Sequence, residues 1–343
     1  MISRVAQLII ILGAVWAIAD AVFNLEHSWL LFIHRALAPV LLVTALVASC
    51  ASLVWMRKRL SFGLLLVQFL IVTACAAPLM RSLLLLPSPA PPLSSASSSF
   101  TLFNYNVLGF EDLSPGIIKE ISSLQPDVVT LQEVNPELAK ALQDNLRSKY
   151  PCQLLDPKEG SWGMGTLSKF PCAELPAPQR GLWVGKPQIT KITLPQNKEL
   201  VIANIHAIHP HIALQRDAGA RGLLRMTDTI RNREETIKAL LEELQITNIQ
   251  NVIIAGDLNA SMRNKIYENI LQSSYVDSWL ELHPASSGGT WPVPGIAGKS
   301  FLSGTLRIDF IFRSSTLRTK SIELLSESIG SDHRGMFAAF DVQ

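Results

Sequence analysis

The sequence has few charged residues and almost no net charge. Only 17% of its 343 residues are charged, against about 25% in an ordinary soluble domain, and 48% are hydrophobic. This combination excludes a disordered chain, which needs low hydrophobicity and high net charge. The formal net charge of +2 excludes a strongly basic nucleic-acid coat protein and an acidic tail protein. The four cysteines are too few for a disulfide scaffold and include no CxxC pair for structural zinc.

The hydrophobic residues are concentrated in the N-terminal third of the chain. Residues 5–25, 38–56 and 62–80 are apolar stretches without Lys or Arg, and each is long enough for a helix that crosses about 30 Å of hydrocarbon. We therefore predict three transmembrane helices within residues 1–82. The alternative is a cleaved signal peptide followed by buried helices, but three such stretches exceed what a signal peptide explains.

The flanking charges predict how this segment lies in the membrane. Arg57, Lys58 and Arg59 separate the second and third stretches, and cytoplasmic loops collect Lys and Arg. We expect this loop and the N-terminus inside, so the chain leaves the third stretch on the extracytoplasmic side. Residues 83–99 are rich in Pro and Ser, which is typical of an exposed, semi-rigid linker.

Residues 100–343 have the size of a single globular domain. The chain after residue 96 holds 24 of the 30 basic and 26 of the 28 acidic residues, a formal net charge of −2. A protein that binds several phosphates of a nucleic-acid duplex normally carries a basic surface. The charge balance therefore weakens a nuclease interpretation.

Hydrophobic patterning predicts more strands than helices in this domain. Helices are expected over residues 115–124, 136–149 and 223–244. Short strands are expected over residues 100–108, 127–132, 152–155, 164–168, 189–194, 200–205, 251–255, 307–312 and 335–340. Because strands often follow strands, we predict a mixed sheet covered by helices, of the α/β or α+β class, and not an all-parallel barrel.

Polar residues stand at or near the ends of several predicted strands: Asn106, Glu133, His206, Asp257, Asn259, Asp309, Asp332 and His333. Each has a structural explanation when taken alone, since Asp and Asn favour turns and caps. Together they form a set of carboxylates, amides and imidazoles that strand ends can bring to one rim. Oxygen ligands of this kind suit Mg²⁺, and the absence of Cys from the set disfavours a zinc-thiolate site.

The motifs that contain these residues resemble the endonuclease/exonuclease/phosphatase superfamily, which has the DNase-I-like fold. They are FNYNV, LQEV, GMGTLSKFP, NIHAIHP, AGDLNA, RIDFIF and SDHRGM, and they extend from residue 103 to residue 337. The resemblance implies a four-layer sandwich of two mixed sheets flanked by helices. It also implies a divalent metal, Mg²⁺ or Mn²⁺, at one rim and hydrolysis of a phosphate ester.

The resemblance also implies a role for each matched residue. Glu133 is expected to be the principal metal ligand, with Asn106 beside it and Asp332 near the metal. Asp257 would orient or deprotonate the attacking water.

The remaining matched residues are expected to handle the phosphate. Asn259 would hold it, and His333, oriented by Asp309, would lie next to its phosphorus. His206 would contact the phosphate or protonate the leaving oxygen. In having a histidine at this place, the sequence resembles the DNase and sphingomyelinase branches of the superfamily.

Three further residues are candidates for substrate contact. Trp291 follows a glycine pair in a loop before the RIDFIF strand and could cover a base or a lipid headgroup. Arg233 lies on the long predicted helix, and His209 follows His206. A loop-anchoring tryptophan, a solvated helix arginine and an exposed loop histidine are the alternatives.

These observations predict a membrane-anchored, metal-dependent phosphohydrolase, most simply a phosphodiesterase, facing away from the cytoplasm. Its substrate would be a phospholipid or a nucleic acid. A DNase- or RNase-type endonuclease and a non-catalytic membrane scaffold are the alternatives. Cys152 and Cys172 flank two predicted strands, and in an oxidising compartment we expect them to form a disulfide, which requires Cα atoms within about 7 Å.

Overall fold

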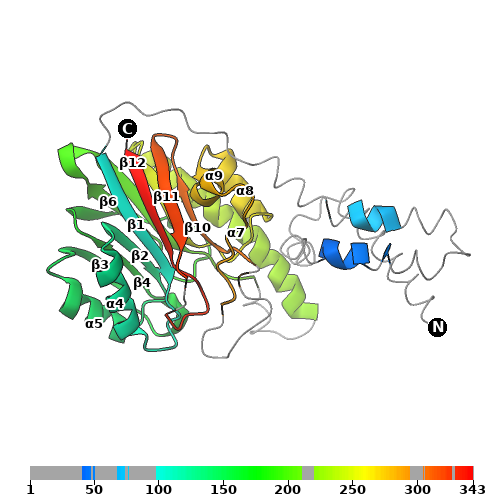
Figure 1. Cartoon of the computed structure of the whole chain (residues 1–343), viewed down its shortest axis with the longest axis horizontal. Helices are drawn as coiled ribbons and strands as arrows, with labels where there is room; N and C mark the ends of the chain where they lie inside the picture. Colours follow the sequence, from blue (N-terminus) through cyan, green and yellow to red (C-terminus); the bar gives the residue numbers. More distant parts are fainter. Residues whose placement is uncertain are drawn as a thin grey trace, which may run out of the picture.

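The globular part of the chain is built on two mixed six-stranded sheets (Figure 1). The computed structural model describes residues 41–47, 49–50, 68–73, 76, 98–210, 220–293, 304, 306–326 and 329–342. The first sheet has the order β11-β12-β1-β2-β4-β3 and the second the order β5-β6-β7-β8-β10-β9.

The strands of the first sheet, in spatial order, are β11 (Leu317–Leu324), β12 (Met336–Val342), β1 (Ser98–Asn106), β2 (Val128–Gln132), β4 (Met164–Ser168) and β3 (Cys152–Asp156). Those of the second are β5 (Cys172–Leu175), β6 (Gln188–Thr193), β7 (Glu199–His206), β8 (Val252–Asp257), β10 (Asp309–Arg313) and β9 (Val276–Asp277). Each sheet has one parallel pair at its centre, β1 with β2 and β7 with β8, among antiparallel neighbours.

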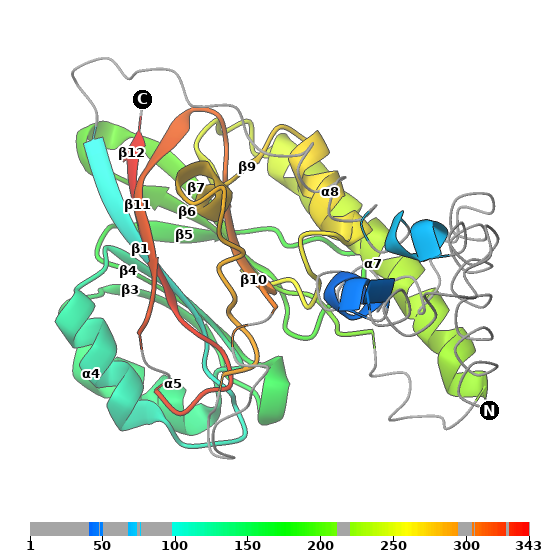
Figure 2. The ribbon, with the colours of Figure 1, turned by 45° about the vertical axis from the view of Figure 1, so that its right-hand side comes forward.

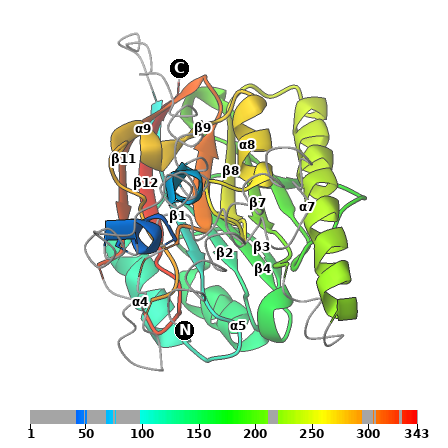
Figure 3. The same cartoon turned by 90° about the vertical axis from the view of Figure 1, so that its right-hand side faces the viewer.

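Helices cover the outer faces of both sheets, which completes the expected four-layer sandwich (Figures 2 and 3). The helices are α4 (Ser114–Leu124), α5 (Pro136–Leu146), α7 (Ala220–Ile246), α8 (Lys265–Gln272) and α9 (Ser278–Leu282). The short 3₁₀ helices are η1 (Gly160–Trp162) and η2 (Pro195–Asn197). α4 and α5 pack on the first sheet, and α7 and α8 pack together on the second.

Alternation along β1 shows how the core is divided between the layers. Phe100 and Leu102 belong to the hydrophobic cluster shared with the second sheet, whereas Phe103 and Tyr105 belong to the cluster beneath α4 and α5. Successive side chains of a strand point to opposite faces, so β1 is buried on both sides. Asn104 and Asn106 therefore face the second sheet, on the same side as Phe100.

All twelve predicted elements are present, with small differences at their ends. The helix expected over residues 136–149 ends at Leu146, because the amides of Lys149 and Tyr150 both turn back to the Leu146 carbonyl. β1 begins at Ser98, so it takes in the last two residues of the expected linker. The sequence prediction missed β5, β9, β11, α8 and α9.

The first predicted membrane stretch lies outside the described residues, and the other two lie largely outside them. Residues 41–47 and 49–50 of the second stretch are helical, as are residues 68–73 and 76 of the third. Within the described parts of the chain, none of the helices combines the length and apolar character needed to cross a bilayer.

A disulfide joins Cys152 to Cys172, with the Cα atoms 5.9 Å apart. The predicted pairing is confirmed, and β3 and β4 form the expected antiparallel hairpin. The bond does more than close this hairpin, because Cys152 begins β3 and Cys172 begins β5, the edge strands of the two different sheets. It therefore ties the edges of the two sheets together.

Candidate active site

Strand pairing brings the polar strand ends to one rim of the sandwich. His206 lies opposite Asp257 in the parallel pair of β7 and β8. β10 runs antiparallel to β8 with Asp309 opposite Asp257, so the start of β10 meets the end of β8. Asn106 and Glu133 stand at and just after the ends of the parallel strands β1 and β2.

The chain turns sharply at Glu133, directly after β2. Its φ of 65° lies in the left-handed region, which is costly for a residue other than glycine; strained residues of this kind cluster at active sites. The Gly109 N–H donates to Glu133 Oε2 at 3.1 Å. A Cβ on Gly109 would lie 2.5 Å from the Glu133 carbonyl oxygen, so only glycine allows this approach.

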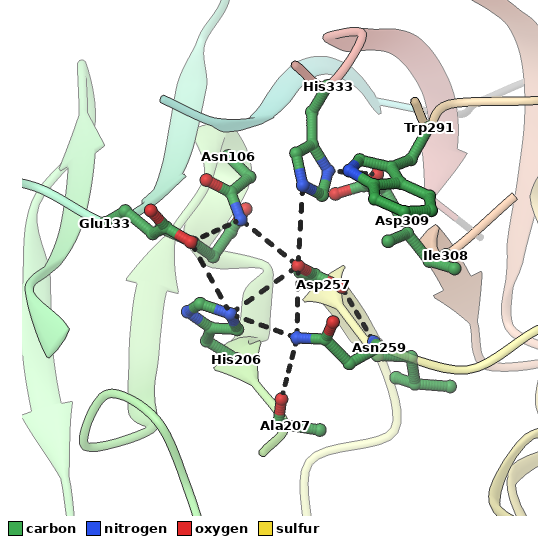
Figure 4. A network of polar contacts seen from close by, with 12 residues as sticks. Asn106, Glu133, His206, Ala207, Asp257, Asn259, Trp291, Ile308, Asp309 and His333 are labelled. Carbon is green, nitrogen blue, oxygen red and sulfur yellow. Dashed lines mark hydrogen bonds and ion pairs between the residues drawn. The ribbon is translucent and has the colours of Figure 1, made fainter. Parts of the chain in front are cut away.

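Asn106 connects the two sheets at the rim. Its Nδ2 donates to Glu133 Oε1 and to Asp257 Oδ2, each at 3.1 Å (Figure 4). Its Oδ1 accepts a hydrogen bond from the Leu108 N–H. Asp257 Oδ2 also lies 3.5 Å from His206 Nε2. Four residues predicted from strand ends thus form one buried cluster.

Asn259 holds the turn that follows β8. Its backbone N–H donates to Asp257 Oδ1 at 2.7 Å, and its φ of 47° is left-handed. Its Nδ2 donates to the Ala207 carbonyl at 3.0 Å and lies 3.2 Å from His206 Nε2. The amide therefore ties the end of β7 to the end of β8.

Asp309 and His333 form a buried dyad, with Asp309 Oδ2 2.9 Å from His333 Nδ1. Sequence reasoning missed two residues that hold this dyad. The Thr290 hydroxyl, fully buried, accepts the N–H groups of Ile308 and Asp309. The Ser331 hydroxyl accepts the His333 N–H and donates to a carbonyl of β1. Their positions beside Trp291 and Asp332 were the available signals.

Burial and neighbouring charges shift three pKa values at the site. Burial lowers the pKa of His206 to about 3, helped by the nearby His333. Burial raises the pKa of Asp257 to about 7, and the charge of Asp309 adds to the rise. Burial alone would lower the pKa of His333, but Asp309, Asp257 and Asp332 overcome it and raise that pKa to about 10. At neutral pH, His206 is therefore neutral and His333 is a cation.

The cluster opens into a cavity of about 320 Å³. Glu133, Asp257 and Asp332 bring three carboxylates to its lining, together with His206, His209 and His333. No Lys or Arg lines the cavity among the residues that the structure describes. Among the described residues, the carboxylates outnumber the cationic groups of this lining, which favours binding of a cation.

This donor set suits a divalent cation that prefers oxygen ligands. Glu133 borders the cavity and accepts a hydrogen bond from Asn106 Nδ2; that this pair binds the metal stays a prediction. Asp257, Asp309 and His333 form a second group, whose ligand atoms lie within 4.8 Å of one another. We favour Glu133 because Asp309 and His333 already bond to each other.

Of the three residues expected to contact substrate, two line the cavity and one does not. Trp291 and His209 line the cavity, and Trp291 Nε1 donates to Asp332 Oδ2 at 2.9 Å. Arg233 lies behind the turn after β8, where Nη2 donates to the carbonyls of Leu258 and Asn259. It is 2% exposed and does not line the cavity. The structure therefore gives Arg233 a supporting position and not the expected substrate contact.

Comparison with solved structures supports the same fold. An AP endonuclease, LMAP, from Leishmania major superposes with a TM-score of 0.55 at 16% identity, covering 77% of this chain and 99% of that one. An endonuclease/exonuclease/phosphatase from Beutenbergia cavernae gives 0.53 at 17% identity, covering 71% and 72%. D. rerio TDP2, in complex with a single-strand DNA product, gives 0.51 at 17% identity, covering 71% and 99%.

A search of curated proteins finds no significant match to this chain. A family model does match, and it extends over residues 103–333, from the strand β1 to the histidine of the dyad. That range includes every residue of the buried cluster. The chain belongs to the endonuclease/exonuclease/phosphatase family.

Proposed function

We propose that this chain is a divalent-metal-dependent phosphodiesterase, anchored in a membrane and acting outside the cytoplasm. The observation that carries the activity is the cavity, where an oriented Asp309–His333 dyad faces three carboxylates and no described Lys or Arg. Membership of the family supports a hydrolase of phosphate esters.

The buried groups divide the chemistry between them. Water attacks phosphorus, a new phosphorus–oxygen bond forms, and the bond to the leaving oxygen breaks. Asp257, with its raised pKa, accepts the proton of the water. His333, a cation held by Asp309, gives a proton to the leaving oxygen. His206, neutral, fixes Asn259 and Asp257.

Glu133, with Asn106 and Asp332, would hold the metal. When bound, a divalent cation lowers the pKa of water and offsets the negative charge of the phosphate. The protein's own contribution is positioning and charge stabilisation, which is what phosphoryl transfer mainly requires.

Two observations support the location. Val43, Val47 and Phe69 are 61%, 64% and 65% exposed on the helical parts of the second and third apolar stretches, as lipid-facing side chains would be. The Cys152–Cys172 disulfide is of a kind that persists in oxidising compartments. A topology reporter fused after Gln343 tests this, and a cytoplasmic signal would contradict it.

The activity is tested with bis(p-nitrophenyl) phosphate, a generic soluble phosphodiester, and Mg²⁺ or Mn²⁺. We expect turnover that EDTA abolishes and that His333→Ala removes. His283→Ala is the matched control, because His283 does not line the cavity and its ring contacts Trp279 and the Ile322 carbonyl instead. A folded protein that turns over neither this diester, DNA nor phospholipid would favour the non-catalytic scaffold.

A further inference from the structure

Two large aromatic side chains are exposed on the segments that border the cavity, Phe110 in its lining and Trp162 directly after the lining residue Ser161. Phe110, in the loop between β1 and α4, is 73% exposed, and Trp162, at the end of η1, is 43% exposed. The Phe110 ring lies against η1, since a Cβ on Gly160 would be 3.0 Å from it. Phe110 and Ser161 both line the cavity, so we call Phe110 and Trp162 the aromatic rim.

Apolar side chains other than the aromatic rim also contribute to the cavity wall. Leu108, Trp291, Leu306 and Ile308 line the cavity. Figure 4 shows Trp291 and Ile308 on the same side of the site as Asp309. Exposed aromatic and aliphatic side chains that lead into a catalytic cavity are typical of a site for an amphiphile, with tryptophan favoured where one end of the ring is wet.

The charges around the aromatic rim disfavour a polyanion. Glu111 and Asp112 follow Phe110, and Glu159 precedes η1; all three are exposed. Lys158, the basic residue beside them, is paired with Asp156 at 2.9 Å. Nucleic-acid binding relies on Lys and Arg that neutralise the phosphates of the backbone. The acidic residues here would repel those phosphates. A zwitterionic surface meets no such repulsion.

We propose that the aromatic rim docks the domain on a bilayer of zwitterionic phospholipid, and that the substrate is a phosphodiester headgroup in that bilayer. The substrate half of this inference rests on the proposed activity, whereas the docking half rests on the proposed membrane anchor and not on the activity. In the reaction, water replaces one ester oxygen on phosphorus, which releases one alcohol and leaves a phosphomonoester.

The chain geometry allows the domain to reach the membrane in this orientation. The predicted linker enters at Ser98, and β1 carries the chain to Asn106 at the site, about 27 Å away at the usual rise of a strand. The linker residues before Ser98, extended as polyproline II, span up to about 46 Å. The linker is therefore long enough for the mouth to turn toward the bilayer that holds residues 1–82.

Docking is measured on the full chain reconstituted in vesicles of phosphatidylcholine with brominated acyl chains, which quench nearby tryptophan. The difference in quenching between wild type and Trp162→Phe isolates the signal of Trp162. In phosphatidylcholine vesicles we expect wild type to be quenched more than Trp162→Phe. The substitution Phe110→Ser should reduce the quenching of Trp162. Two anionic controls are included. In vesicles of phosphatidylglycerol we expect less quenching of Trp162. Single-stranded DNA added to phosphatidylcholine vesicles should not reduce the quenching.

Catalysis is measured in the same vesicles as the ratio of phosphatidylcholine turnover to bis(p-nitrophenyl) phosphate turnover. Trp162→Ser is expected to lower this ratio about tenfold, because the variant loses the contact that the indole makes with the bilayer. Ile246→Ser is the matched control, since Ile246 is 74% exposed at the far end of α7, and its ratio should equal that of wild type.

The outcomes separate the two proposals. No Trp162 quenching, or competition by DNA, overturns the docking. Turnover of the soluble diester with an unchanged ratio in Trp162→Ser overturns the lipid substrate and leaves the proposed function in place. Absence of turnover on every substrate overturns the proposed function, and the quenching then decides the docking alone.

Discussion

The Asp309 carboxylate lies 2.9 Å from Nδ1 of His333, and both side chains are buried. This contact fixes the imidazole so that Nε2, the other ring nitrogen, stands 3.9 Å from Asp257 Oδ2. It also keeps a positive charge in a cavity lined by carboxylates. Asp309 therefore has two effects on His333: it orients the imidazole ring and it stabilises the positive charge. These two effects can be tested separately.

Asp309→Asn tests the electrostatic effect. Because the negative charge of Asp309 raises the pKa of His333 against the opposing effect of burial, its loss should lower that pKa. In the proposed mechanism His333 acts as a cation, so activity should be lost as pH rises through its pKa. The alkaline limb of the kcat/KM profile should therefore move to lower pH, with kcat reduced about 10²-fold or more. An alkaline limb at the wild-type pH would contradict this role.

Glu133→Gln tests the metal assignment. The substitution keeps the shape of the side chain but removes the charge expected to hold a cation, so the Mn²⁺ concentration for half-maximal activity should rise about 10- to 100-fold. Isothermal titration of the protein with Mn²⁺ should show the same loss of affinity. Glu137→Gln is the matched control on the exposed first turn of α5. Equal Mn²⁺ affinity in Glu133→Gln and wild type would move the metal to the group of Asp257, Asp309 and His333.

The candidate cluster was predictable because its residues follow strands. Parallel neighbouring strands deliver their ends to one edge, so FNYNV, LQEV, NIHAIHP and AGDLNA carry their polar residues to one place. The short motifs are themselves constrained, as the left-handed Glu133 and Asn259 show. The local sequence was enough to predict the cluster, because the position of a residue along its strand determines at which edge of the sheet its side chain lies.

Elements set by tertiary packing were not predictable in the same way. β11 alternates buried and exposed residues on both sides of a bulge between Thr319 and Ser321, but the bulge shifts the alternation by one residue and so breaks the period. α8 has only eight residues, too few for a clear helical period. Apart from its position beside Trp291, Thr290 gave no signal in the sequence, because its hydroxyl accepts N–H groups at the start of β10, which is distant along the chain.

Arg233→Leu tests the supporting position of this arginine. The guanidinium donates to the carbonyls of Leu258 and Asn259, and burial lowers its pKa to about 9, still above neutral pH. Removing it leaves buried carbonyls without these donors, at about 1–3 kcal/mol for each group. Urea unfolding should show this loss of stability. Arg231→Leu, two residues earlier and exposed, should unfold like wild type; equal losses in both variants would refute the supporting position.

The disulfide offers a test of how the two sheets are held together. Cys152 and Cys172 close a loop with a sequence separation of 20 between edge strands of different sheets. The chain-entropy model assigns such a loop about 3 kcal/mol of stabilisation. The double variant Cys152→Ser/Cys172→Ser should lose about this much free energy of unfolding, and dithiothreitol should destabilise wild type equally but leave the variant unchanged. Cys50→Ser, which keeps the bond, should retain the sensitivity to dithiothreitol. If dithiothreitol leaves the unfolding of wild type unchanged, the sheets are held by their shared hydrophobic core alone and the bond adds nothing to it.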